Sequence, residues 1–109
     1  MLSLSQDQLD RITELEQHQY VVEVRRQVII SNPEMGSDHG LLDRLKLAFA
    51  YCKEIGFTHG GAITQFLFYE AFAPNFYRAQ AVDTWLRRSD PEQRFSDLLA
   101  VARAKMEEL

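Results

Sequence analysis

Apolar side chains recur at helical spacing along most of the chain. The clearest stretch runs from residue 41 to residue 55, with apolar positions at Leu41, Leu45, Ala48, Phe49, Cys52 and Ile55. This spacing places all six side chains on one face of an amphipathic helix. Gly56 follows where a helix commonly ends in a left-handed residue, and Phe57 can then contact Cys52. We therefore predict that this helix ends in a Schellman motif.

The stretch Gly60–Phe72 is apolar on more than one face, because the four residues from Phe66 to Tyr69 are all large and apolar or aromatic. A helix that is apolar all round must be buried on several sides. We therefore predict that this helix is central, with Thr58 as its cap and Pro74 as its end. The Gly-Gly pair that opens it either permits close approach of another backbone or is a weak first turn.

The N-terminal stretch is predicted to be a helix that starts at Ser5, where Gln8 completes a capping box, and that ends before Pro33. Its broad apolar stripe comprises Leu9, Ile12, Tyr20, Val24 and Val28. Val21–Ile30 is rich in β-branched residues and could instead form a strand. We favour the helix because no second strand is available to pair with it. The segment Pro33–Asp38 is expected to be a loop, with Ser37 or Asp38 capping the next helix.

Two further helices are predicted after the central one. A short helix over Gln80–Arg88 would bury three residues, Val82, Trp85 and Leu86. The last helix would be capped by Asp90, start at Pro91, use Gln93 to close a capping box and run to about Glu108. Its inward residues would be Phe95, Leu98, Leu99, Ala102 and Met106. The chain is thus predicted to be one all-α domain over residues 1–109, a compact bundle or orthogonal array of about five helices.

Composition narrows the function classes. The chain has 12 basic and 16 acidic residues, a net charge of −4, and no basic face of the kind that binds nucleic acid. No apolar run is long enough to span a membrane, and the polar, acidic start is not a secretory signal, so we expect a cytoplasmic protein. The single cysteine, Cys52, excludes an internal disulfide and is expected to pack in the core.

The sequence offers no constellation of catalytic residues, metal ligands or cofactor-binding residues. His39 has Asp43 four residues later but lacks a recognisable metal motif, and the paired glycines lack the context of a phosphate-binding loop. The carboxylate pairs Glu14 with Glu16 and Glu107 with Glu108 fall on faces expected to be exposed. We therefore expect a non-enzymatic protein without a cofactor.

Seven aromatic residues fall within twenty positions: Phe66, Phe68, Tyr69, Phe72, Phe76, Tyr77 and Trp85. In the simplest interpretation they form the core. Aromatic side chains are also enriched at binding hot spots, and there are more of them than one small core needs. We therefore hypothesise that Tyr69, Phe76, Tyr77 and Trp85 line a partner surface. If that surface is self-complementary, it would also form a homodimer.

The residues at which the helices end and restart resemble those of small helical accessory proteins encoded in bacterial type VI secretion effector clusters. The matching positions are Ile55–Thr58, Ala73–Phe76 and Trp85, and the resemblance extends from Leu41 to Phe95. This chain differs from the group in having Ala73 in place of a glycine and Asn75 in place of an aspartate. The resemblance implies an accessory role without catalytic residues, in which the protein helps to hold or load an effector together with a larger adaptor.

Two functions follow from these observations. The first is a co-chaperone-like protein that binds a secreted effector or its adaptor. The alternative is an immunity protein that neutralises a toxin, since small acidic proteins often bind basic enzymes through charge complementarity. In the alternative, the acidic first helix would contact the toxin.

Overall fold

The computed structural model describes residues 14–107, and within them the chain forms five α-helices, two short 3-10 helices and no strand. The elements are α2 (Glu14–Ser31), η1 (Pro33–Ser37), α3 (Leu41–Ile55), α4 (Gly60–Phe72), η2 (Phe76–Arg78), α5 (Gln80–Leu86) and α6 (Pro91–Glu107). The all-α prediction is confirmed, and the β-branched segment is helical within α2. The predicted start at Ser5 and the stripe residues Leu9 and Ile12 lie outside the described residues.

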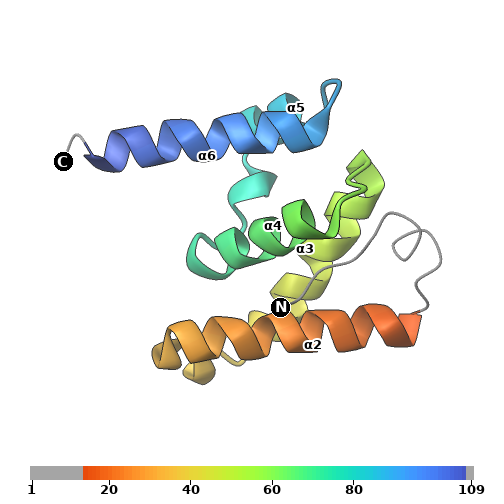
Figure 1. Ribbon diagram of the computed structural model, residues 1–109, viewed down its shortest axis with the longest axis vertical. Coiled ribbons are helices and arrows are strands. Elements are labelled where there is room, and N and C mark those ends of the chain that lie inside the picture. Colours follow the sequence, from red (N-terminus) through yellow and green to blue (C-terminus); the bar gives the residue numbers. More distant parts are fainter. Residues whose placement is uncertain (1–13, 108–109) are drawn as a thin grey trace.

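The helices are arranged so that α3 and α4 lie between α2 on one side and α5 with α6 on the other (Figure 1). The Tyr20 ring of α2 meets the Phe49 ring of α3 edge-on, at 5.5 Å between centroids. On the opposite side, the Phe95 ring of α6 lies 5.0 Å from that of Phe66 in α4. One continuous apolar core therefore runs through the three layers.

The end of α3 follows the prediction. Gly56 has a φ of 104°. The N–H of Phe57 donates to the carbonyl of Cys52 at 2.9 Å, and the N–H of Gly56 donates to that of Lys53 at 3.3 Å. These two bonds define a Schellman motif, which satisfies carbonyls that the helix itself leaves unpaired. Cys52 is buried in the core, as predicted, and Phe57 is buried as well.

Helix starts follow the predictions less closely. Asp38 accepts a hydrogen bond from the N–H of Gly40 at 3.0 Å, but Gly40 holds the N-cap position of α3. The predicted loop from Pro33 contains the 3-10 helix η1. Helix α6 starts at Pro91 as predicted, whereas Asp90 has a φ of 60° and not the extended backbone typical of an N-cap.

The two residues that lead into α4 are bonded to a carboxylate from another helix. Thr58 was the predicted cap, but the N-cap position belongs to His59. The carboxylate of Glu92 in α6 accepts hydrogen bonds from the backbone N–H groups of Thr58 at 3.3 Å and His59 at 3.1 Å. Burial raises the pKa of Glu92, but the hydrogen bonds from the His59 ring and from these two backbone groups outweigh it, and the net pKa is lowered. Helix α6 thus stabilises the start of α4.

Helix α4 is buried on several sides, as predicted, and its fully buried side chains include Ile63, Phe66 and Leu67. Its one strongly exposed aromatic residue is Phe72, at 51%. A Cβ added at Gly61 would meet no atom within 4 Å, so Gly61 is not needed for close backbone approach.

Helix α5 ends at Leu86, two residues earlier than predicted; Leu86 is buried. The side chain of Met106 lies outside the described part.

Candidate protein-binding groove

An apolar groove of about 460 Å³ lies between the C-terminal half of α4 and the later turns of α6; we call it the α4–α6 groove. Its lining comprises Thr64, Gln65, Phe68, Tyr69, Phe72, Leu99 and Arg103. The aromatic side chains all come from α4, while α6 contributes Leu99 and the guanidinium group of Arg103. The half-exposed Phe72 makes this groove a candidate binding site, because large exposed apolar side chains gathered in a hollow often mark interaction surfaces.

The groove exists because α6 meets α4 chiefly through its first turns. Phe95 packs against Phe66 at 5.0 Å and against Tyr69 at 6.3 Å between ring centroids. Beyond that contact α6 continues to Glu107, and its later turns extend along the C-terminal half of α4 (Figure 1). Leu99 is half-buried at the groove wall. A partner side chain can therefore enter between the two helices.

The four residues predicted to line a partner surface do not form one patch. Tyr69 is half-buried and lines the α4–α6 groove. Phe76 is also half-buried, with its ring 4.7 Å from that of Tyr69 and 4.9 Å from that of Phe66. Tyr77 is only 4% exposed, and its ring packs 4.5 Å from the ring of Tyr51. Partner binding by these residues stays a prediction, and Tyr69 is the one at the groove.

Trp85 of α5 contacts α6 and the segment between the two helices. Its indole N–H donates to the carbonyl of Arg94 at 3.0 Å. The guanidinium groups of Arg94 and Arg88 lie 4.5 Å and 5.6 Å from the centroid of its ring. With these cation–π contacts in place, Trp85 is half-buried. Trp85 therefore serves to join α5 to the start of α6.

A buried carboxylate, which the sequence interpretation missed, fixes the end of α4. Glu70 is fully buried, and its carboxylate accepts hydrogen bonds from the N–H of Asn75 at 2.9 and 3.1 Å and from Nε of Arg44 at 3.3 Å. Arg44 also donates to Asp38 at 2.9 Å and to the carbonyl of Ala71 at 3.2 Å. This network ties the residues after α4 to α3 and so fixes one end of the groove.

Burial raises the pKa of Glu70, and the N–H of Asn75 with the charges of Arg44 and Arg78 offsets only part of that rise. The sequence did contain a signal for this network. Glu70 is the only charged residue in the thirteen residues of α4, and a buried charge needs hydrogen-bond donors and an opposite charge. The partner Arg44, 26 positions away, could not be identified from local spacing.

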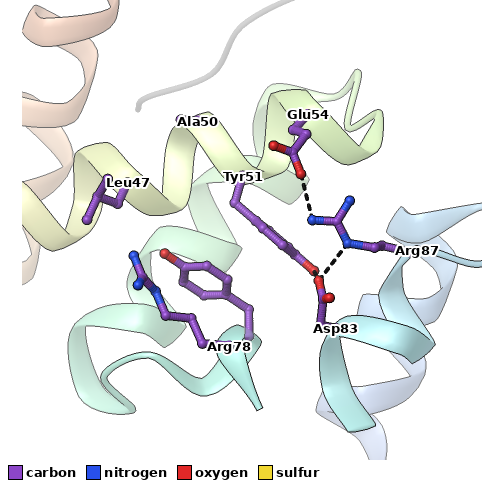
Figure 2. Close-up of a pocket in the computed structure, with 8 residues that line it drawn as sticks. Leu47, Ala50, Tyr51, Glu54, Arg78, Asp83 and Arg87 are labelled. Atoms are coloured by element: carbon purple, nitrogen blue, oxygen red, sulfur yellow. Dashed lines mark hydrogen bonds and ion pairs between the residues drawn. The ribbon is translucent and has the colours of Figure 1, made fainter. Parts of the chain in front are cut away.

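A second hollow, of about 430 Å³, lies between α3, η2 and α5; we call it the α3–α5 hollow (Figure 2). Its lining comprises Leu47, Ala50, Tyr51, Glu54, Tyr77, Arg78, Asp83 and Arg87. The hydroxyl of Tyr51 donates to Asp83 at 2.6 Å, and Arg87 donates to Asp83 at 2.8 Å and to Glu54 at 2.6 Å. Burial, followed by the bond to Asp83, raises the pKa of Tyr51.

The described residues contain no group of three or more His, Cys, Asp or Glu side chains that could hold a metal ion. Cys52 is fully buried, and this burial raises the pKa of its thiol well above the ordinary value. Burial therefore keeps the thiol protonated, whereas a nucleophilic cysteine needs a stabilised thiolate and access to solvent. Its position agrees with the predicted role in core packing.

No model of a known protein family matches the chain, and no curated protein or solved structure matches it significantly either. Within residues 14–107, none of the helices combines the length and the apolar character needed to cross a membrane.

Proposed function

We propose that this protein is a non-enzymatic, co-chaperone-like accessory protein that binds a secreted effector or its adaptor in the bacterial cytoplasm. The observation that carries the proposal is the α4–α6 groove, where Phe72 is 51% exposed beside Phe68 and Tyr69. The residues at the helix ends resemble those of accessory proteins of type VI secretion clusters. This resemblance supports a secreted effector or its adaptor as the partner.

The groove suits an amphipathic helix of the partner. Two helices form its walls, and helix-in-groove recognition uses apolar residues spaced by about one helical turn against such a surface. Phe68 and Phe72 are four residues apart, so they lie on the same side of α4. Arg103 at the α6 wall would favour an acidic residue beside the apolar residues of the partner helix.

The test is a pull-down from the native host with tagged wild-type protein, with Phe72→Ser and with Ile30→Ser as a matched control. Ile30 is 60% exposed on α2, so both variants replace an exposed apolar side chain. Each should cost less than about 1 kcal/mol of folding stability. We expect wild type and Ile30→Ser to recover a large secreted protein together with an adaptor, and Phe72→Ser to lose both.

Other outcomes would overturn the proposal. Equal recovery by Phe72→Ser and wild type would exclude the α4–α6 groove as the binding site. Recovery of a single toxin domain would favour the immunity alternative, which also predicts that deleting the gene poisons cells that carry the toxin. If only this protein is recovered, neither binding function holds.

A further inference from the structure

The α3–α5 hollow has two sides with different chemistry. On one side, Arg87 donates to both Asp83 and Glu54, and Asp83 also accepts from the hydroxyl of Tyr51. The guanidinium group of Arg87 also lies 5.3 Å from the centroid of the Tyr51 ring. The hydrogen-bonding groups on this side are therefore already engaged within the protein, as the dashed lines in Figure 2 show.

The other side carries donors without such partners. The guanidinium group of Arg78 forms no ion pair within the described residues and lies 5.8 Å from the Tyr77 ring. Tyr77 lines the hollow and is only 4% exposed, but its hydroxyl is not fully enclosed and forms no hydrogen bond within the described residues. In Figure 2, Arg78 lies below Leu47, away from the bonded side.

We propose that the α3–α5 hollow binds a carboxylate carried on a short apolar body, as found in an acidic side chain or the C-terminus of a peptide. The guanidinium group of Arg78 would pair with the carboxylate, and the hydroxyl of Tyr77 would donate a hydrogen bond to it. The apolar body would lie against Leu47, which is 52% exposed, and Ala50. A hollow of about 430 Å³ is within the usual size range of small-ligand sites.

The charge of the hollow favours a carboxylate over a phosphate. Arg78 and Arg87 contribute two positive charges, and Glu54 and Asp83 contribute two negative ones, so the four groups sum to zero. A ligand with one negative charge can pair with Arg78 while the other three groups stay bonded together. A doubly charged phosphate would bring an excess negative charge close to Glu54 and Asp83, which lie in the same hollow.

The experiment uses three blocked peptides and amide chemical shifts of the ¹⁵N-labelled protein. N-acetyl-Leu-Glu-amide carries a side-chain carboxylate, N-acetyl-Leu-Leu carries a C-terminal carboxylate, and N-acetyl-Leu-Gln-amide carries neither. We expect at least one of the acidic peptides to shift the amides of Tyr51 and Arg78 with a dissociation constant of about 1–10 mM. The neutral peptide should bind about tenfold more weakly. Comparing the two acidic peptides identifies which source of carboxylate the hollow prefers.

Variants locate the site. Arg78→Gln should weaken binding of the acidic peptide about tenfold, and Tyr77→Phe should weaken it about threefold. Arg88→Gln removes the same charge from an exposed position outside the hollow and should leave binding unchanged. The proposal fails if acidic and neutral peptides bind alike, if no peptide shifts these amides, or if Arg78→Gln binds as tightly as wild type.

This site is independent of the α4–α6 groove, and the two proposals can fail separately. Phe72→Ser, which tests the groove, should leave the peptide titration unchanged because Phe72 does not line the α3–α5 hollow. Conversely, Arg78→Gln should still recover the partner in the pull-down if the groove alone holds it.

Discussion

The hydrogen bonds from the two residues before α4 to Glu92 predict that the start of α4 depends on a residue in α6. Glu92 is 20% exposed at its side chain and accepts from two backbone N–H groups at the helix start. Loss of a cap costs typically about 1 kcal/mol, and a carboxylate adds about 0.5 kcal/mol through the helix dipole. We therefore expect Glu92→Ala to lose about 1.5 kcal/mol of unfolding free energy and Glu92→Gln about 0.5 kcal/mol.

The assay is urea and thermal unfolding followed by circular dichroism, with Gln93→Ala as the control. Gln93 is the next residue of α6, is exposed, and donates only to Asp97 within its own helix. The control should cost less than about 0.5 kcal/mol, whereas Glu92→Ala should lower the melting temperature by about 10 °C. Hydrogen exchange should quicken at the amides of Thr58 and His59. If Glu92→Ala unfolds like Gln93→Ala, the cap has no energetic role.

The pH dependence gives an independent check of the same bonds. The pKa of Glu92 is lowered from 4.5 in the folded protein. The stability that Glu92 contributes to the folded protein is therefore present above pH 4.5 and is lost as the pH falls through the folded pKa. Glu92→Gln cannot titrate, so the stability gap between wild type and this variant should close on acidification. A gap that stays constant would contradict the assigned cause of the shift.

Three other substitutions have predictable signs. The pKa of Glu70 is raised above 4.5, so the stability it contributes is present below that pH and is lost as the pH rises through the folded pKa. Urea unfolding should therefore show wild type losing stability relative to Glu70→Gln as the pH rises above 4.5. A gap that moves in the opposite direction would contradict this burial effect. Gly56→Ala should cost about 1 kcal/mol because φ is positive there, whereas Gly61→Ala in the first turn of α4 should gain about 0.5 kcal/mol. Thermal unfolding measures both, and equal effects would refute the conformational argument.

The features that the sequence predicted are those encoded by neighbouring residues. Gly56 and Phe57 define the end of α3 because a Schellman motif involves only six consecutive residues. Prolines predicted the ends of α2 and α4 because the residue before proline is excluded from helical geometry. Apolar spacing predicted the buried stripes of α2 and α3 for the same local reason.

The features that were missed depend on residues distant in sequence. Thr58 has the chemistry of a cap, but Glu92, 34 positions later, supplies the acceptor. From the sequence, Tyr69 and Tyr77 are equally suited to a surface. Only the tertiary packing of Tyr77 against Tyr51 and Phe66 shows that Tyr77 is the buried one. The α4–α6 groove could not be predicted either, because its shape depends on how α6 crosses α4.

The dependence of α4 on α6 has a consequence for biosynthesis. Ribosomes make α4 first, and the backbone N–H groups of Thr58 and His59, just before it, have no carboxylate acceptor until Glu92 has left the exit tunnel. Before then, Phe66 and Tyr69 also lack the cover that Phe95 provides. A nascent chain halted before α6 would therefore expose the aromatic centre of the protein, which is the feature that quality-control chaperones and proteases recognise.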